Sequence, residues 1–205
     1  DIFLTWGWKT HGNYNLKAFP LPSPHLSKIR FKQYKMKKKS LLLVSNLVPL
    51  MADRLASGVQ PNSAIKYRDY KEKVLEHLKP EIFKNTVYKP YFSESGGLQD
   101  KDYFKEKFRH LKISKRDFSY HIKYSRCVLI DHPGTSMLES LSANIPTLLF
   151  WNPKLWAFSK EAKEYFDSLL KVGILHQTPD SLTKFINSNW SNIEDWWFND
   201  DLQVV

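Results

Sequence analysis

The feature that most constrains this fold is the stretch CVLIDHPGTSMLESLSANIPTLLFWN, residues 127–152. It opens with four consecutive apolar residues, 127–130, a run typical of a strand buried on both faces of a parallel sheet. A polar, turn-forming loop and a short apolar stripe at helical spacing follow, and Pro146 then leads into a second apolar run, residues 147–151. A strand, helix and strand joined this closely predict a right-handed parallel crossover.

Strands and helices alternate through the rest of the chain. Residues 41–44 and 86–91 are predicted strands, and the spacing of Tyr67, Tyr70, Val74 and Leu78 predicts a helix that ends before Pro80. Further helices are expected at 51–58, 103–111, 117–124, 159–170 and from 178 onward, with short strands at 110–114 and 174–176. This order predicts an α/β fold with a Rossmann-like parallel sheet flanked by helices on both faces.

The predicted domain occupies residues 41–187. Residues 1–40 precede it as an extended interdomain segment that ends in a basic linker, KIRFKQYKMKKK at 28–39. Residues 188–205 form a tryptophan-rich tail in which Trp190, Ile193, Trp196 and Trp197 recur at near-helical spacing. Exposed together they would make a sticky patch, so we expect them to cover this domain or to pack against a partner domain.

Length and charge narrow the class of protein. With 205 residues the chain is long enough for one sizeable α/β domain but not for two. Its net charge of +10 indicates anionic partners such as nucleotide phosphates, a membrane surface or nucleic acid. A single cysteine, Cys127, excludes an internal disulfide, and no apolar run is long enough to span a membrane. We expect a cytoplasmic protein, with peripheral contact at the inner face of the membrane as a further expectation.

The loop after residue 130 has the composition of an anion site. Gly134 allows close backbone approach, the hydroxyls of Thr135 and Ser136 can donate hydrogen bonds, and the first N–H groups of the next helix face the same point. Glu139, one turn into that helix, can accept both hydroxyls of a ribose, and His132 is a further candidate contact. The alternative is structural: Ser136 and Glu139 also match a capping box, S-x-x-E.

Other strand ends supply further candidates. Ser45 and Asn46 follow the first buried strand, where a dinucleotide-binding fold would carry its glycine fingerprint; the sequence SNLVPL disfavours ordinary NAD binding. They either contact a ligand or cap the next element. Lys89, near the end of the second strand, either neutralises a phosphate or is simply exposed.

A family resemblance adds to these observations. Residues 131–146 read D-x-x-G-T-S-x-x-E-x-L-x-x-x-I-P, which resembles the donor-binding segment of GT-B-type glycosyltransferases, especially bacterial transferases associated with surface carbohydrates. The resemblance implies the C-terminal of two Rossmann-like domains, in which small residues hold the donor phosphates and the glutamate holds the ribose. Many relatives have glycine where this chain has Asn144, a residue type that tolerates left-handed geometry.

The resemblance also implies a function and partners. It implies transfer of a sugar from a nucleotide-sugar donor to a bacterial surface polysaccharide or glycan, with a glycan or lipid-linked acceptor. The catalytic base would lie in an N-terminal Rossmann-like domain, so no catalytic residue is assigned, and neither a cofactor nor a metal is expected. The alternatives are a polyol-phosphate transferase, a sugar-nucleotide epimerase and a nonenzymatic polyanion-binding module, for which nucleic acid is the less favoured partner.

Overall fold

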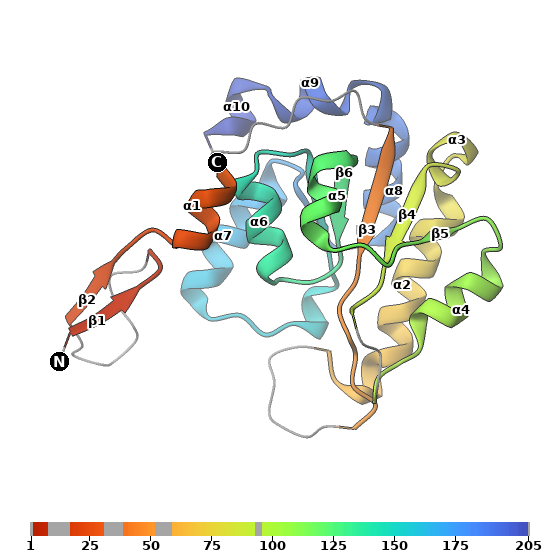
Figure 1. The fold of residues 1–205 in the computed structure, drawn as a ribbon, viewed down its shortest axis with the longest axis horizontal. Coiled ribbons are helices and arrows are strands. Elements are labelled where there is room, and N and C mark those ends of the chain that lie inside the picture. Colours follow the sequence, from red (N-terminus) through yellow and green to blue (C-terminus); the bar gives the residue numbers. More distant parts are fainter. Residues whose placement is uncertain (1, 8–16, 31–38, 52–58, 93–95, 205) are drawn as a thin grey trace.

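The structure, a computed structural model, describes residues 2–7, 17–30, 39–51, 59–92 and 96–204 (Figure 1). Its centre is a six-stranded sheet in the order β5-β4-β3-β6-β7-β8, and every strand pair in it is parallel. The strands are β3 (Ser40–Val44), β4 (Thr86–Lys89), β5 (Lys112–Ile113), β6 (Ser125–Ile130), β7 (Thr147–Phe150) and β8 (Leu175–His176).

The strand order is that of a Rossmann fold. From β3 the chain proceeds outward to β4 and β5, then returns to place β6 on the other side of β3 and continues outward to β7 and β8. The direction of winding therefore reverses between β3 and β6, where ligands of such sheets bind. The predicted α/β class and Rossmann-like parallel sheet are confirmed.

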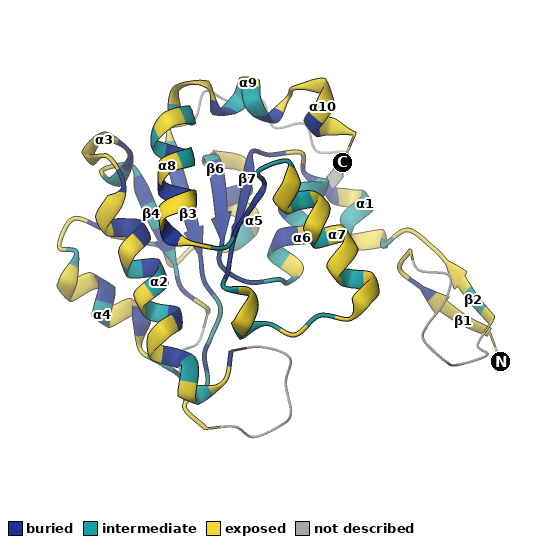
Figure 2. Cartoon of the chain, turned by 180° about the vertical axis from the view of Figure 1, so that it is seen from behind, coloured by how far each residue is buried: buried dark blue, intermediate teal, exposed yellow. Residues whose placement is uncertain are grey.

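Helices cover both faces of the sheet, as Figures 1 and 2 show. One face packs against α2 (Ala64–His77), α3 (Pro80–Phe83), α4 (Asp100–Lys107) and α8 (Pro179–Asn189). The other packs against α1 (Pro24–Arg30), α5 (Phe118–Tyr124), α6 (Thr135–Ser142) and α7 (Lys160–Lys171). Three short 3-10 helices, Pro61–Ser63, Pro153–Leu155 and Trp190–Asn192, complete the connections in the described residues.

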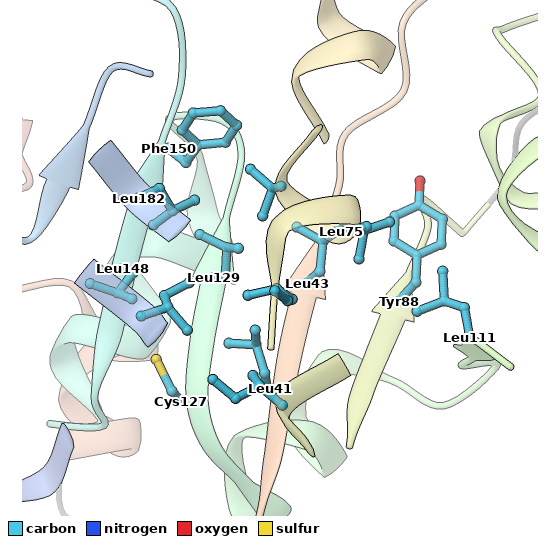
Figure 3. Close-up of a cluster of buried hydrophobic side chains, with 14 of the residues drawn as sticks. Leu41, Leu43, Leu75, Tyr88, Leu111, Cys127, Leu129, Leu148, Phe150 and Leu182 are labelled. Carbon is cyan, nitrogen blue, oxygen red and sulfur yellow. The ribbon is translucent and has the colours of Figure 1, made fainter. Parts of the chain in front are cut away.

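The core explains why the central strands are apolar at consecutive positions. Leu41, Leu43 and Leu129 face the cluster around α2 and α8 that Figure 3 shows. The residues between them, such as Leu42 and Val128, face the cluster around α1, α5 and α6. Because side chains of a strand alternate between two covered faces, every position must be apolar.

The N-terminal region differs in part from the prediction. Residues 2–5 and 17–20 form a separate two-stranded parallel sheet, β1 (Ile2–Thr5) and β2 (Lys17–Pro20), that protrudes from the body (Figure 1). The prediction of an extended segment through residue 40 is wrong for residues 24–30, which form α1. Pro24 occupies the first position of this helix. Proline is favoured there, since its fixed φ suits the helix and its missing N–H is not needed.

Two predicted segments fall largely outside the described residues. These are the helix at 51–58 and the basic run at 28–39, of which residues 28–30 belong to α1. None of the helices that the structure describes has the length and apolar character to cross a bilayer.

The C-terminal tail covers this domain, which is one of its two expected roles. It forms α9 (Ile193–Trp197) and α10 (Asp200–Gln203), and Ile193, Trp197 and Leu202 are buried in the two main clusters. Asn144, before β7, fixes the tail: its Oδ1 accepts from Trp197 Nε1 at 2.7 Å and from Gln203 Nε2 at 3.2 Å. Its φ of 49° confirms the predicted left-handed geometry.

Candidate functional site

A cavity of about 430 Å³ opens where β3, β4 and β6 end. Two backbone hydrogen bonds hold these strand ends together: Ser45 N–H donates to the Lys89 carbonyl at 3.1 Å, and Asp131 N–H to the Val44 carbonyl at 3.2 Å. The cavity lies at the reversal point of the sheet, beside the first turn of α6. The residues that line it are Val44, Ser45, Asn46, Lys89, Pro90, Tyr91, Phe92, Asp117, Phe118, His132, Pro133, Gly134, Thr135 and Ser136.

The structure brings nearly all the candidate residues together. Those around this cavity are Ser45, Asn46, Lys89, His132, Gly134, Thr135 and Ser136. Glu139 is not among the lining residues. Its Oε1 lies 2.8 Å from Nε2 of His25, which belongs to α1 on the neighbouring side of α6. This contact occupies one of the two carboxylate oxygens that a ribose would use.

The start of α6 does not form a capping box. Gly134 is the N-cap residue, and no side chain caps the helix, so the structural alternative proposed for Ser136 and Glu139 is wrong. Within the described residues, the backbone N–H groups of Thr135 and Ser136 have no acceptor, while that of Met137 already donates to the Gly134 carbonyl at 3.1 Å. Two unpaired donors at a helix N-terminus favour a bound anion.

Space, rather than backbone geometry, favours glycine at position 134. Its φ of −169° is extended and open to any residue. A Cβ placed on it would lie 3.0 Å from Cδ2 and 3.3 Å from Nε2 of His132. The close backbone approach to a ligand expected at this glycine stays a prediction.

His132 lies between two polar partners. Its Nδ1 is 2.9 Å from Oδ1 of Asp131, and its Nε2 is 3.3 Å from Oγ of Ser136. The residue is 8% exposed, and Asp131 is 1% exposed. An ionised carboxylate can only accept, so Asp131 assigns the proton of the neutral ring to Nδ1 and leaves Nε2 to accept from the Ser136 hydroxyl.

A buried network fixes Asp131. Its Oδ2 accepts from the Ser45 hydroxyl and lies 3.7 Å from Nζ of Lys71. Lys71, on α2, is 1% exposed and also donates to Ser45 Oγ at 2.9 Å and to Asp100. Asp100 in turn accepts from Arg68 Nε at 2.6 Å. Two carboxylates and two cations thus compensate one another, with Lys71, Asp100 and Asp131 buried and Arg68 partly exposed.

The network sets the ionisation of its members. Burial alone would raise the pKa of Asp131, but Lys71, the contact with His132 and the Ser45 hydroxyl outweigh it, so the pKa is lowered and the side chain is a carboxylate at neutral pH. Burial, reinforced by Asp131, raises the pKa of Tyr67 well above its ordinary value. The Tyr67 hydroxyl accepts from the Asn46 N–H at 3.3 Å and so fixes the loop after β3.

Lys89 supplies a cation that the protein does not neutralise directly. No carboxylate among the described residues lies within salt-bridge distance of its Nζ. Partial burial lowers the pKa of Lys89, and the charge of Asp117 opposes that shift. A half-buried ammonium group in a polar cavity suits a phosphate.

Sequence reasoning missed Lys71 and Asp100, and it quoted Asp131 as part of the motif without giving it a role. Lys71 had a detectable signal, because it lies on the apolar stripe of its helix, four residues after Tyr67 and three before Val74. A lysine at such a position is buried and needs an anionic partner. Asp131 directly follows a buried strand, a position that faces the ligand side of a parallel sheet.

Fold and site together define a Rossmann-like α/β protein with a polar, cation-bearing cavity at the reversal point of its sheet. A comparison with protein families is more specific: the model of the LIC12162 family transferases matches residues 1–205, and the chain belongs to that family. It is therefore a member of a transferase family. A search of curated proteins returned no match.

Proposed function

We propose that this chain is the donor-binding domain of a GT-B-type glycosyltransferase. It binds a nucleotide-activated sugar for transfer to a bacterial surface polysaccharide or glycan. The observation that carries the proposal is the cavity at the β3–β6 reversal. Lys89, the Thr135 hydroxyl and the two α6 N–H groups that have no acceptor within the described residues converge there. Such donors stabilise the negative charge that develops on a departing phosphate.

The partners follow from this role. The acceptor is a glycan or a lipid-linked saccharide, and a second Rossmann-like domain closes over the donor. Exposed apolar side chains support a second domain because they suit packing against another sheet. They include Leu4 on β1, Phe19 on β2 and Trp6, just after β1. Cytoplasmic placement and peripheral contact with the inner face of the membrane belong to the same proposal.

The first experiment is a thermal-stability screen of the chain with nucleotides, nucleotide-sugars and polyol-linked nucleotides such as CDP-glycerol. A ligand at 100 times its dissociation constant stabilises a protein by about 2.7 kcal/mol. For a chain of this size that corresponds to a rise in Tm of roughly 5–10 °C. A nucleotide-sugar that gives such a rise supports the proposal, and a preference for CDP-glycerol supports a polyol-phosphate transferase instead.

Lys89→Ala tests the phosphate contact. Losing one charged hydrogen bond costs about 1.5–3 kcal/mol, so nucleotide affinity should fall roughly 10- to 100-fold. Lys84→Ala is the matched control, because Lys84 is exposed and precedes the opposite end of the same strand. Equal nucleotide affinity in both variants contradicts the proposed site.

The net charge of +10 favours one rival of another class, a polyanion-binding module. Such a module would bind heparin or nucleic acid with strong salt dependence and would not respond to Lys89→Ala more than to Lys84→Ala. Heparin binding of that kind, without stabilisation by any nucleotide, overturns the transferase proposal.

A further inference from the structure

The stabilisation of charge described above does not use the pair Asp131–His132, of which His132 lines the cavity. Nδ1 of His132 faces the carboxylate at 2.9 Å, and Nε2 faces the Ser136 hydroxyl at 3.3 Å. Ser136 also lines the cavity, beside the free N–H groups of α6. Nε2 is therefore the ring nitrogen nearest to the point where an anion would bind.

The ring orientation is fixed from several sides. Asp131 cannot turn away, since its second oxygen is held by Ser45 and Lys71. On its other side the ring lies near Gly134, since a Cβ on that residue would come within 3.0 Å of Cδ2. An imidazole held on one nitrogen by a fixed carboxylate, with the other nitrogen toward a ligand, has the arrangement of a proton-transfer group.

We propose that His132 transfers a proton to the departing phosphate of the donor, and that Asp131 is the residue that positions it. This inference rests on the proposed function. The bond between the transferred sugar and the phosphate oxygen breaks, and its electron pair remains on that oxygen. The Nε2 proton of the His132 imidazolium moves to the same oxygen, while the acceptor hydroxyl forms the new bond and releases its own proton to solvent. His132 then takes up a proton from water.

Because of the charged groups around the His132 ring, the proton transfer depends on a bound anion. Asp131 stabilises a positive imidazolium, while Lys71 on α2 and Lys89 on β4 oppose it. Asp117, before α5, Tyr91, after β4, and the neutral Tyr67 are further titratable groups near the cavity. An anion bound between Lys89 and α6 adds the negative charge that favours protonation of His132. Anion binding and proton uptake should therefore be coupled.

The same geometry offers a competing role, in which His132 removes the Ser136 proton and makes Ser136 a covalent nucleophile. A fluorophosphonate probe separates the two roles. Labelling of Ser136 in the native chain that is lost in His132→Gln overturns the proposal, since the proton partner of His132 is then the serine and not the phosphate. Absence of labelling is the expected result.

The main test is NMR of the histidine side chains in the full chain, with inorganic sulfate as the probe because sulfate does not titrate near neutral pH. His132→Gln assigns the His132 signals, and exposed His110 is the internal control. Sulfate should raise the titration midpoint of His132 by about one pH unit, equivalent to roughly 1.4 kcal/mol, and leave His110 unchanged. Without sulfate, the neutral His132 ring should carry its proton on Nδ1. Asp131→Asn should give a mixture of the two His132 tautomers without unfolding the chain.

The outcomes distinguish this inference from the proposed function. If sulfate stabilises the native chain but not Lys89→Ala, and the His132 midpoint does not move, the proton-transfer role fails while the anion site stands. If neither sulfate nor any nucleotide binds, the proposed function fails and the inference with it. With a donor that is turned over, His132→Gln should lower kcat about 10²- to 10⁴-fold and change KM little. A raised KM with unchanged kcat overturns the role.

Discussion

At the scale of single residues, Gly134 makes the cavity sensitive to added volume. Replacing it by valine places a Cβ 3.0 Å from the His132 ring and two methyl groups beyond it. We expect Gly134→Val to displace the ring and obstruct the free N–H groups, so the nucleotide-dependent rise in Tm is lost, while overpacking costs about 1–3 kcal/mol of unfolding free energy. Thr135→Val, a nearly isosteric change in the same loop, removes one hydroxyl donor without adding volume, so it should reduce the rise without abolishing it. Native-like nucleotide binding by Gly134→Val contradicts the site.

Lys71 tests the buried network. Lys71→Met removes the cation that compensates Asp100 and Asp131, and breaking a buried ion pair from one side costs about 3–5 kcal/mol. The control is Lys163→Met, which breaks the exposed pair with Asp167 one helical turn away and should cost only about 0.3–0.5 kcal/mol. Urea denaturation at pH 7 measures both. Similar losses in the two variants would mean that Lys71 does not hold the strand ends.

The buried His176 makes the stability of the domain depend on pH. Burial lowers the pKa of His176, whose Nδ1 contacts Ser181 Oγ at 2.9 Å while Nε2 is buried without a partner in the described structure. Between its folded pKa and the unfolded value of about 6.5, the unfolded chain binds a proton that the native chain does not. Stability from this group is thus present above pH 6.5 and is lost as the pH falls.

The measurement is urea unfolding at pH 7.5 and 5.5. His176→Phe keeps the ring contact with Phe185 and removes the titration, so it should reduce the loss of stability between the two pH values. His110→Gln, at an exposed position, should keep the native loss. An undiminished loss in His176→Phe would assign the pH dependence to other groups, of which His121 is the first candidate because burial, together with Lys89, lowers its pKa as well.

At the scale of elements, local chemistry made much of the fold predictable. The runs at 41–44 and 127–130 indicated buried strands because both faces are covered. The helices expected at 159–170 and from 178 onward are α7 and α8, and Ser159 and Thr178 cap them through their side chains. The cavity residues were found because they follow strands, and the ends of parallel strands meet at one edge of a sheet.

What could not be predicted depends on contacts between distant segments. Glu139 pairs with His25, 114 positions away, and no local pattern indicates that α1 lies beside α6. The position of Lys71 on an apolar stripe indicates burial, but its partners Ser45 and Asp131 are known only once β3 and β6 place them in front of it. The short helix at Pro24 was hidden in a proline-rich stretch, because proline at a first helical position resembles proline in an extended chain.

The tail is the element whose contribution is easiest to measure. Trp197 is 3% exposed and donates to Asn144, whereas its neighbour Phe198 is 54% exposed. We expect Trp197→Ala to lower the unfolding free energy by about 3–5 kcal/mol, since a large buried side chain leaves a cavity. Phe198→Ala should change it by less than about 0.5 kcal/mol. Equal effects in urea denaturation would mean that the tail is not packed on the domain.

At the scale of the whole molecule, the protruding pair β1–β2 contrasts with the packed sheet. Ile2 and Leu4 are 68% and 62% exposed, while the side chains of β3 are buried from Leu41 onward. A two-stranded sheet has little stability of its own, and apolar side chains on it favour association with another sheet. The pair should therefore contribute to association rather than to the stability of the domain.

The double variant Ile2→Lys with Leu4→Lys tests this division. Because both side chains are exposed, the unfolding free energy should change by less than about 0.5 kcal/mol, while binding of the dye ANS and concentration-dependent self-association of the isolated chain both decrease. Leu43→Ala, in the central strand, should instead lower the unfolding free energy by about 2–5 kcal/mol, because it opens a cavity in the core. It should not decrease ANS binding or self-association. Urea denaturation and analytical ultracentrifugation separate the two effects. A large loss of stability in the double lysine variant would show instead that β1 belongs to the cooperative core, and β1–β2 would then no longer support a second domain.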